Sequence, residues 1–153
     1  MFDSIDRRIL ATLQRDAEIS LNELAERVGL SKTPCWRRIQ RLEKEGYIER
    51  RVALLNAEKL NVALTAFIAV RTDQHSQDWL QSFQEAVQDI PEILGVYRTT
   101  GDIDYLLHAV VPDMKAYDAL YQRLIAKVPL SDVSSFFVME DVKHTTELPL
   151  DYL

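Results

Sequence analysis

The side chains with the clearest chemical capacity lie between positions 30 and 51. Seven of these residues are Lys or Arg and three are Glu. Arg and Gln can make paired hydrogen bonds to guanine and adenine edges, whereas Lys and Thr more often hold phosphates. We therefore expect contacts to double-stranded DNA from Lys32, Thr33, Trp36, Arg37, Gln40 and Arg41. On charge alone, a solvated basic helix face explains the same residues equally well.

Three residues in this stretch have other expected roles. Trp36 can lie against a thymine methyl group or a sugar, or it can cover the preceding helix, and the sequence leaves both open. Arg38 lies nearer the apolar side and is expected to form a local ion pair. Cys35 belongs to an apolar stripe with no nearby His, so we expect a buried small hydrophobe rather than a nucleophile.

A second candidate site is the turn Thr99–Tyr105, which reads Thr-Thr-Gly-Asp-Ile-Asp-Tyr. Gly101 can adopt a positive φ and expose successive N–H groups, which form a small nest for a carboxylate. Asp102 or Asp104 could then accept hydrogen bonds from an ammonium group. This chemistry suits an amino acid, although an ordinary Gly-Asp turn accounts for the same residues.

The sequence carries no signature of a metal site, a cofactor or catalysis. The single cysteine excludes an intramolecular disulfide framework, and His75, His108 and His144 have no metal-ligand spacing. There is no Gly-rich phosphate loop, nucleophile elbow or carboxylate pair with a catalytic partner. No apolar run approaches the roughly 20 residues that cross a bilayer, and the N-terminal residues lack a signal-peptide pattern. We expect a cytoplasmic protein that is not an enzyme.

The elements that must position the basic residues are three short helices. Their patterns cover residues 4–15, 20–28 and about 32–45, and Gly29 and Gly46 are natural stops. In the third helix Cys35, Ile39 and Leu42 fall on one face, opposite the expected DNA contacts. The tight link of residues 28–30 between the second and third helices predicts a helix-turn-helix in residues 1–50.

The second half of the chain has a different pattern and a different charge. Strand and helix periods alternate in the order strand, helix, strand, strand, helix, strand. The fold class is therefore α+β: an N-terminal (winged) helix-turn-helix domain plus a C-terminal ferredoxin-like βαββαβ domain with an antiparallel sheet. Residues 47–55 read as a wing or a linker strand, with a hinge at 51–61 and the second domain at 62–153. The net charge of −6 divides into +2 for residues 1–55 and −8 for the remainder.

One face of such a sheet is left without helices. Because the strands are apolar almost throughout, we expect a second subunit to cover that face, and hence a homodimer. A dimer of helix-turn-helix modules would read half-sites about 10 base pairs apart or a multiple of that.

The whole chain resembles the Lrp/AsnC, or feast/famine, family of transcription regulators. The N-terminal match lies in Ile5–Leu10, Leu24–Ser31, Thr33–Arg38, Leu42-Glu43 and Gly46–Ile48. The C-terminal match lies in Gly101–Leu107, Val111–Met114 and Val138–Lys143. The resemblance implies dimers that assemble into octamers, with small effectors, usually amino acids, bound in clefts between dimers.

The resemblance also implies which residues bind the effector. It places the cleft at the turn, so the first candidates are Thr100, Gly101, Asp102, Asp104 and Tyr105. The facing side would draw on Ser134, Ser135, Phe136 and Phe137, and Met114 is a further candidate. Residues 33–36 and 143–149 are similar to the regulators that respond to cysteine or other sulfur amino acids. Ser135-Phe136-Phe137 departs from the leucine-responsive pattern, so leucine is not assumed.

The predicted function is a sequence-specific DNA-binding transcription regulator whose assembly or DNA affinity is modulated by a small effector, a sulfur or other hydrophobic amino acid. One alternative is a ligand-independent architectural DNA-binding protein. Another is a ferredoxin-like small-molecule enzyme or sensor whose helical unit docks proteins.

Overall fold

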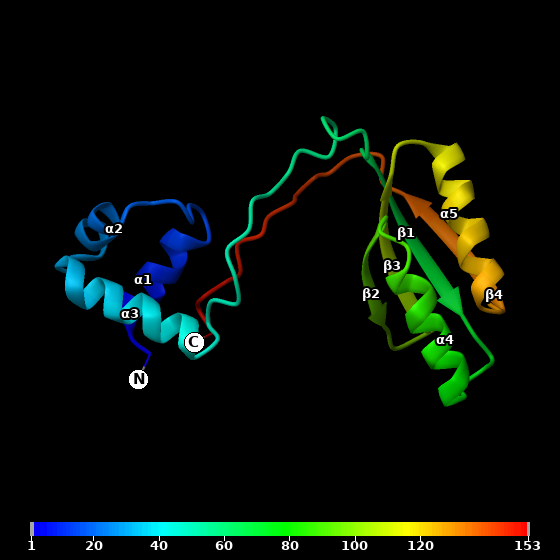
Figure 1. Cartoon of the computed structure of the whole chain (residues 1–153), viewed down its shortest axis with the longest axis horizontal. Helices are drawn as coiled ribbons and strands as arrows, with labels where there is room; N and C mark the ends of the chain where they lie inside the picture. The colour runs from blue at the N-terminus through cyan, green and yellow to red at the C-terminus, as the bar shows by residue number, and fades with distance from the viewer. Residues whose placement is uncertain (1, 153) are drawn as a thin grey trace. The chain divides into compact units, whose positions relative to one another are not determined.

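The computed structural model describes residues 2–152. The chain divides into two compact units (Figure 1). The N-terminal unit holds residues up to Leu54 together with those from Lys143 onward, and the C-terminal unit is Leu55–Val142. The sequence predicts that residues 143–153 belong to the second domain, whereas the C-terminal segment, residues 143–152, lies with the first unit.

The N-terminal unit contains the three predicted helices: α1 (Ser4–Leu13), α2 (Leu21–Val28) and α3 (Lys32–Lys44). Asp3 and Asp6 form a reciprocal capping box at the start of α1. Gly29, at φ 72°, ends α2, where a left-handed residue is easiest for glycine. The apolar stripe of α3 packs on the first two helices. The buried cluster is Ile9, Leu10, Leu24, Ala25, Val28, Cys35, Ile39 and Leu42.

Two local features of this unit differ from the prediction. The first helix ends at Leu13 rather than at Arg15. Residues 47–55, predicted as a wing or a linker strand, form no hydrogen-bonded strand. This stretch has apolar side chains but no neighbouring strand in its unit with which to pair. Instead Tyr47 lies against Phe2, with the ring centroids 5.2 Å apart.

The C-terminal unit has the predicted ferredoxin-like order. Its elements are β1 (Leu64–Arg71), α4 (Gln77–Gln88), β2 (Ile93–Arg98), β3 (Tyr105–Val111), α5 (Met114–Lys127) and β4 (Asp132–Phe137). The strands form one sheet in the order β2-β3-β1-β4, and every neighbouring pair is antiparallel. The last strand ends at Phe137.

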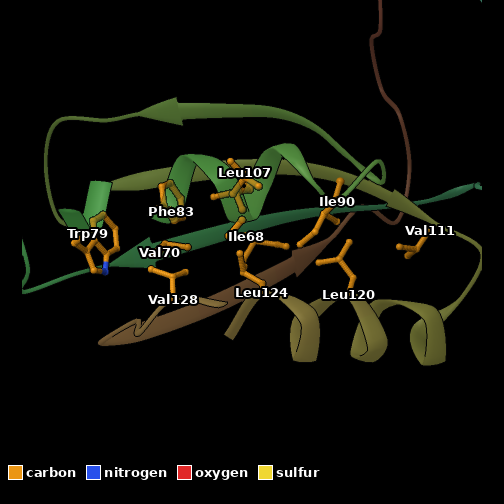
Figure 2. Packing of buried hydrophobic residues seen from close by; sticks show 13 residues of the cluster. Ile68, Val70, Trp79, Phe83, Ile90, Leu107, Val111, Leu120, Leu124 and Val128 are labelled. Carbon is orange, nitrogen blue, oxygen red and sulfur yellow. The ribbon is translucent and has the colours of Figure 1, made fainter. Parts of the chain in front are cut away.

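Both helices pack on one face of this sheet. Figure 2 shows the core that they bury, with Phe83 and Ile90 from the region of α4 and Leu120 and Leu124 from α5 lying over the sheet. The other face carries a row of apolar and aromatic side chains. It includes Phe67, whose ring stacks on His108 at a centroid distance of 5.1 Å, and Phe136, which is 60% exposed.

Candidate functional site

The buried apolar stripe of α3 determines which side of the helix is exposed. Because Cys35, Ile39 and Leu42 face the core, the opposite side of the helix lies in solvent. The exposed residues on it are Lys32, Thr33, Trp36, Arg37, Gln40 and Lys44. Trp36 is 51% exposed, so its ring is available to a partner. Five of the six predicted DNA-contact residues therefore share one accessible surface.

The sixth, Arg41, differs from the other five. The side chain of Arg41 is half-buried, and its Nη2 donates a hydrogen bond to Oδ2 of Asp6 at 2.5 Å. Arg38 donates to the second oxygen of the same carboxylate, Oδ1, at 2.8 Å, and also to Asp3. The predicted local ion pair of Arg38 is thus present, and Arg41 shares it. No sequence pattern indicated Asp6 as the partner, because it lies 35 positions from Arg41.

Asp6 is completely buried, which would normally disfavour its charged form. Burial raises the pKa of the Asp6 carboxyl, but hydrogen bonds from Arg41 and Arg38 outweigh it and hold the pKa below the ordinary value. At Asp3, hydrogen bonding by the backbone of Asp6 and then by Arg38 lowers the pKa to about 2. Both carboxylates are therefore charged near neutral pH, and they fasten α3 to the start of α1.

The predicted ligand turn lies between β2 and β3, and its glycine has the expected positive φ. Gly101 adopts φ 104°, and the Thr99 hydroxyl donates to the carbonyl of Ile103 at 2.6 Å. The carboxylate of Asp104 accepts the backbone N–H of Thr72 at 2.8 Å, so this group holds the end of β1. Asp102 is exposed, and its carboxylate remains the better acceptor for a ligand.

The ten candidate effector residues do not form one site within a single chain. Tyr105 pairs with Val70 at the end of the sheet next to the turn, whereas Val111, just before Met114, pairs with Leu64 at the opposite end. In β4, Ser134 and Phe136 lie on the open face of the sheet. Ser135 hydrogen-bonds to Tyr117 of α5 on the helix side, and Phe137 packs edge-on against Tyr117.

A groove beside the edge strand β2 is a feature of the C-terminal unit that sequence reasoning missed. This groove of about 710 Å³ lies between α4 and the edge strand β2. Val96 and Arg98 line it from the strand, Leu80 and Val87 from the helix. Tyr105 is its one residue in common with the predicted effector set. The alternation of β2 could have indicated that Val96 and Arg98 share the helix-covered face.

Two features are absent from the described part of the chain. Residues 2–152 include no group of three or more His, Cys, Asp or Glu side chains that could hold a metal ion. None of the helices described there is long and apolar enough to cross a membrane.

A helix-turn-helix with an exposed basic face, together with a ferredoxin-like domain that carries a glycine turn, defines a ligand-binding regulator of transcription. Residues 2–49 match the family described as winged helix-turn-helix DNA-binding, and residues 65–148 match the Lrp/AsnC ligand binding domain. The chain belongs to the Lrp/AsnC family, as the sequence motifs predicted. It is a DNA-binding transcription regulator with a separate ligand-binding domain.

Three relatives show how similar the chain is to known members. It is 49% identical to the DNA-binding transcriptional activator DecR of Escherichia coli (strain K12), over 99% of this chain and 100% of that one. A crystal structure of an AsnC family transcriptional regulator from Agrobacterium tumefaciens is 55% identical, with a TM-score of 0.95 and 99% coverage of both chains. The transcriptional regulator NMB0573 from Neisseria meningitidis, solved as a complex with L-Met, is 38% identical with the same TM-score and coverage.

Proposed function

We propose that the effector of this regulator is an amino acid with a sulfur-containing or other hydrophobic side chain. The observation that carries the proposal is the Gly101 turn, in which Gly101 has a positive φ and Asp102 is exposed. Backbone N–H groups of such a turn would suit a carboxylate, and Asp102 would suit an ammonium group. The Neisseria relative that is complexed with L-Met supports an amino acid of this kind.

The effector site is built from more than one chain. Within one chain the turn and Met114 lie at opposite ends of β3, and Ser134 and Ser135 lie on opposite faces of β4. A second subunit is needed to bring side chains of such different positions around one small molecule. Effector binding would then change the assembly, and by linkage the assembly and DNA would change effector affinity by the same factors.

The open face of the sheet is the proposed dimer interface. Phe67, His108 and Phe136 form an aromatic surface there, and Tyr97 is 56% exposed beside it. Burial of such a face against a second copy removes apolar area from water at about 25 cal/mol per Å². Further association of dimers into an octamer is proposed from the family resemblance.

DNA contact is proposed for Lys32, Thr33, Trp36, Arg37 and Gln40, supported by their common exposed surface on α3. Because its guanidinium is held by Asp6, we assign Arg41 to positioning of the helix. A regulator must reach DNA, so we propose a cytoplasmic location. We propose no catalytic activity, because no arrangement of side chains described above unites a nucleophile with a base.

A thermal-shift screen of the full chain against the proteinogenic amino acids tests the effector. A ligand at 100 times its Kd stabilises the folded state by about 2.7 kcal/mol. For a unit of this size, that corresponds to a rise in melting temperature of roughly 10 °C or more. Cysteine or methionine should give the shift, Asp102→Ala should remove it, and the exposed control Asp118→Ala on α5 should retain it. A shift that survives Asp102→Ala would contradict the site.

The rival architectural function makes a different prediction. Such a protein binds through phosphate neutralisation alone, so it shows a steep salt dependence and little sequence preference. An amino-acid panel that changes neither DNA affinity nor assembly would favour it. If Arg37→Ala leaves the chain folded but abolishes DNA binding, a protein-docking role for the helical unit is excluded.

A further inference from the structure

The C-terminal segment, residues 143–152, packs against α1 and the residues that directly follow it. The side-chain amide of Gln14, the C-cap residue of that helix, makes two hydrogen bonds to the backbone of Leu148. Its Nε2 donates to the carbonyl at 3.1 Å, and its Oε1 accepts the N–H at 3.0 Å. One glutamine thereby satisfies both backbone groups of a residue 134 positions away. Figure 1 shows this red end of the chain within the N-terminal unit.

Other contacts extend along the same segment. Arg15 Nε lies 2.8 Å from Oε2 of Glu147, and Arg7 Nη1 lies 3.8 Å from Oδ1 of Asp151. Between these two ion pairs, Leu150 packs against the hydrophobic cluster of the three helices. Exposed ion pairs contribute little by themselves. The apolar contact and the paired hydrogen bonds are therefore the main source of the attachment.

The C-terminal segment contacts α1, and α1 in turn contacts α3. Arg7 and Gln14 of the α1 region contact the segment, and Asp6, next to Arg7, accepts the hydrogen bonds of Arg38 and Arg41 of α3. All of these residues belong to the N-terminal unit. The route from the segment to α3 thus passes through α1 and needs no contact between the segment and DNA.

We propose that residues 147–151 contribute to the function of the DNA-binding domain. By packing on α1 they fix the orientation of α3, and this raises the affinity of α3 for DNA. The domain is then assembled from two parts of the chain that the ligand-binding domain separates. Gln14 and Leu150 are positioning residues in this arrangement. The proposal does not depend on the identity of the effector.

Electrostatics alone predicts that loss of the segment strengthens DNA binding, which is the opposite of the proposed effect. Glu147 and Asp151 are negative charges in a domain that binds a polyanion. Removing them without any change of structure would strengthen DNA binding. If the segment positions α3, its removal weakens binding instead.

The experiment compares two truncations of the full chain, one that lacks residues 147–153 and a control that lacks only 152–153. The probe is a DNA duplex selected from a random library by the unaltered chain, and Kd is measured without effector by fluorescence anisotropy at several salt concentrations. We expect the longer truncation to bind about tenfold more weakly, equivalent to about 1.4 kcal/mol. The slope of log Kd against log salt should not change, because no phosphate contact is lost.

Equal or tighter binding by the longer truncation overturns the proposal. So does weaker binding that is accompanied by a smaller assembly in light scattering, because the segment would then act through oligomerisation. If that truncation fails to fold, Gln14→Ala decides, with Gln122→Ala on the exposed side of α5 as its control. A loss of about threefold or more relative to the control supports the proposal, and equal affinities overturn it.

Discussion

The carboxylate of Asp6 is fully buried and accepts a hydrogen bond from the guanidinium of Arg41 at 2.5 Å. This contact separates Arg41 from its neighbour Arg37, although both are arginines on the same helix. Arg37 lies in solvent and is available to DNA, whereas Arg41 joins α3 to α1. The two arginines should therefore respond differently to substitution.

Replacement of Arg37 and of Arg41 should weaken DNA binding in distinguishable ways. Arg37→Ala removes a proposed direct contact, so we expect a change in sequence preference or a decrease of about 0.9 in the salt slope, without a change in melting temperature. Arg41→Ala removes one charged hydrogen-bond donor from the buried Asp6 carboxylate, which keeps Arg38 and the Asp3 N–H, and should destabilise the N-terminal unit by about 1–3 kcal/mol. Its salt slope should remain that of the unaltered chain. A reduced slope for Arg41→Ala with unchanged stability would show that Arg41 contacts phosphate after all.

The stability of the N-terminal unit should fall in acid because of the same group. The folded pKa of Asp6 lies below the ordinary value for an aspartate, and that of Asp3 is about 2. A group whose folded pKa is depressed stabilises the native state above its unfolded pKa, and that contribution is lost as the pH falls through the folded pKa. The loss should therefore begin near pH 5 and continue to about pH 2.

Amide resonances of α1 to α3, followed by NMR during acid titration, report on this unit alone. This matters because Arg123 also lowers the pKa of Glu92 in the C-terminal unit. In Asp6→Asn the acid-dependent part should shrink, at the cost of lower stability at neutral pH. An unchanged titration in Asp6→Asn would exclude Asp6 as its source.

The stripe of α3 shows what the sequence could predict. Cys35, Ile39 and Leu42 recur at helical spacing, and a local period is enough to fix which side of a helix is buried. The same reasoning predicted the alternation of helices and strands in the second half. Both depend on near neighbours in the sequence, where the geometry of one helix or strand decides the outcome.

Arg41 and Leu148 show why the remainder was missed. The wheel places Arg41 on the polar side, but its role depends on Asp6, which belongs to another helix. Leu148 lies in a stretch with no helix or strand period, and its partner Gln14 is near the opposite end of the chain. Contacts of this kind are selected by the whole fold. Periodicity carries no information about them.

Disruption of the open sheet face should dissociate the proposed dimer. In Phe136→Asp, a carboxylate from each copy would enter an apolar interface, where unpaired charges are strongly disfavoured. Light scattering should then give the 17.7 kDa mass of a single chain. Gln81→Asp, on the outer side of α4, is the control and should retain the larger assembly. A dimer that persists in Phe136→Asp would place the interface elsewhere.

Substitution of the two aspartates of the proposed ligand turn should distinguish a structural role from a ligand-binding role. Asp104 accepts the N–H of Thr72, which is only 8% exposed, so Asp104→Ala leaves a buried donor unsatisfied. We expect Asp104→Ala to lower the stability of the C-terminal unit by about 1–3 kcal/mol even without ligand. Asp102→Ala should leave that stability unchanged and remove only the ligand-induced thermal shift, because the exposed Asp102 has no such structural role. Unfolding of both variants by urea, with and without L-methionine, checks the difference. If Asp102→Ala is destabilised as much as Asp104→Ala in the absence of ligand, Asp102 serves the turn rather than the ligand.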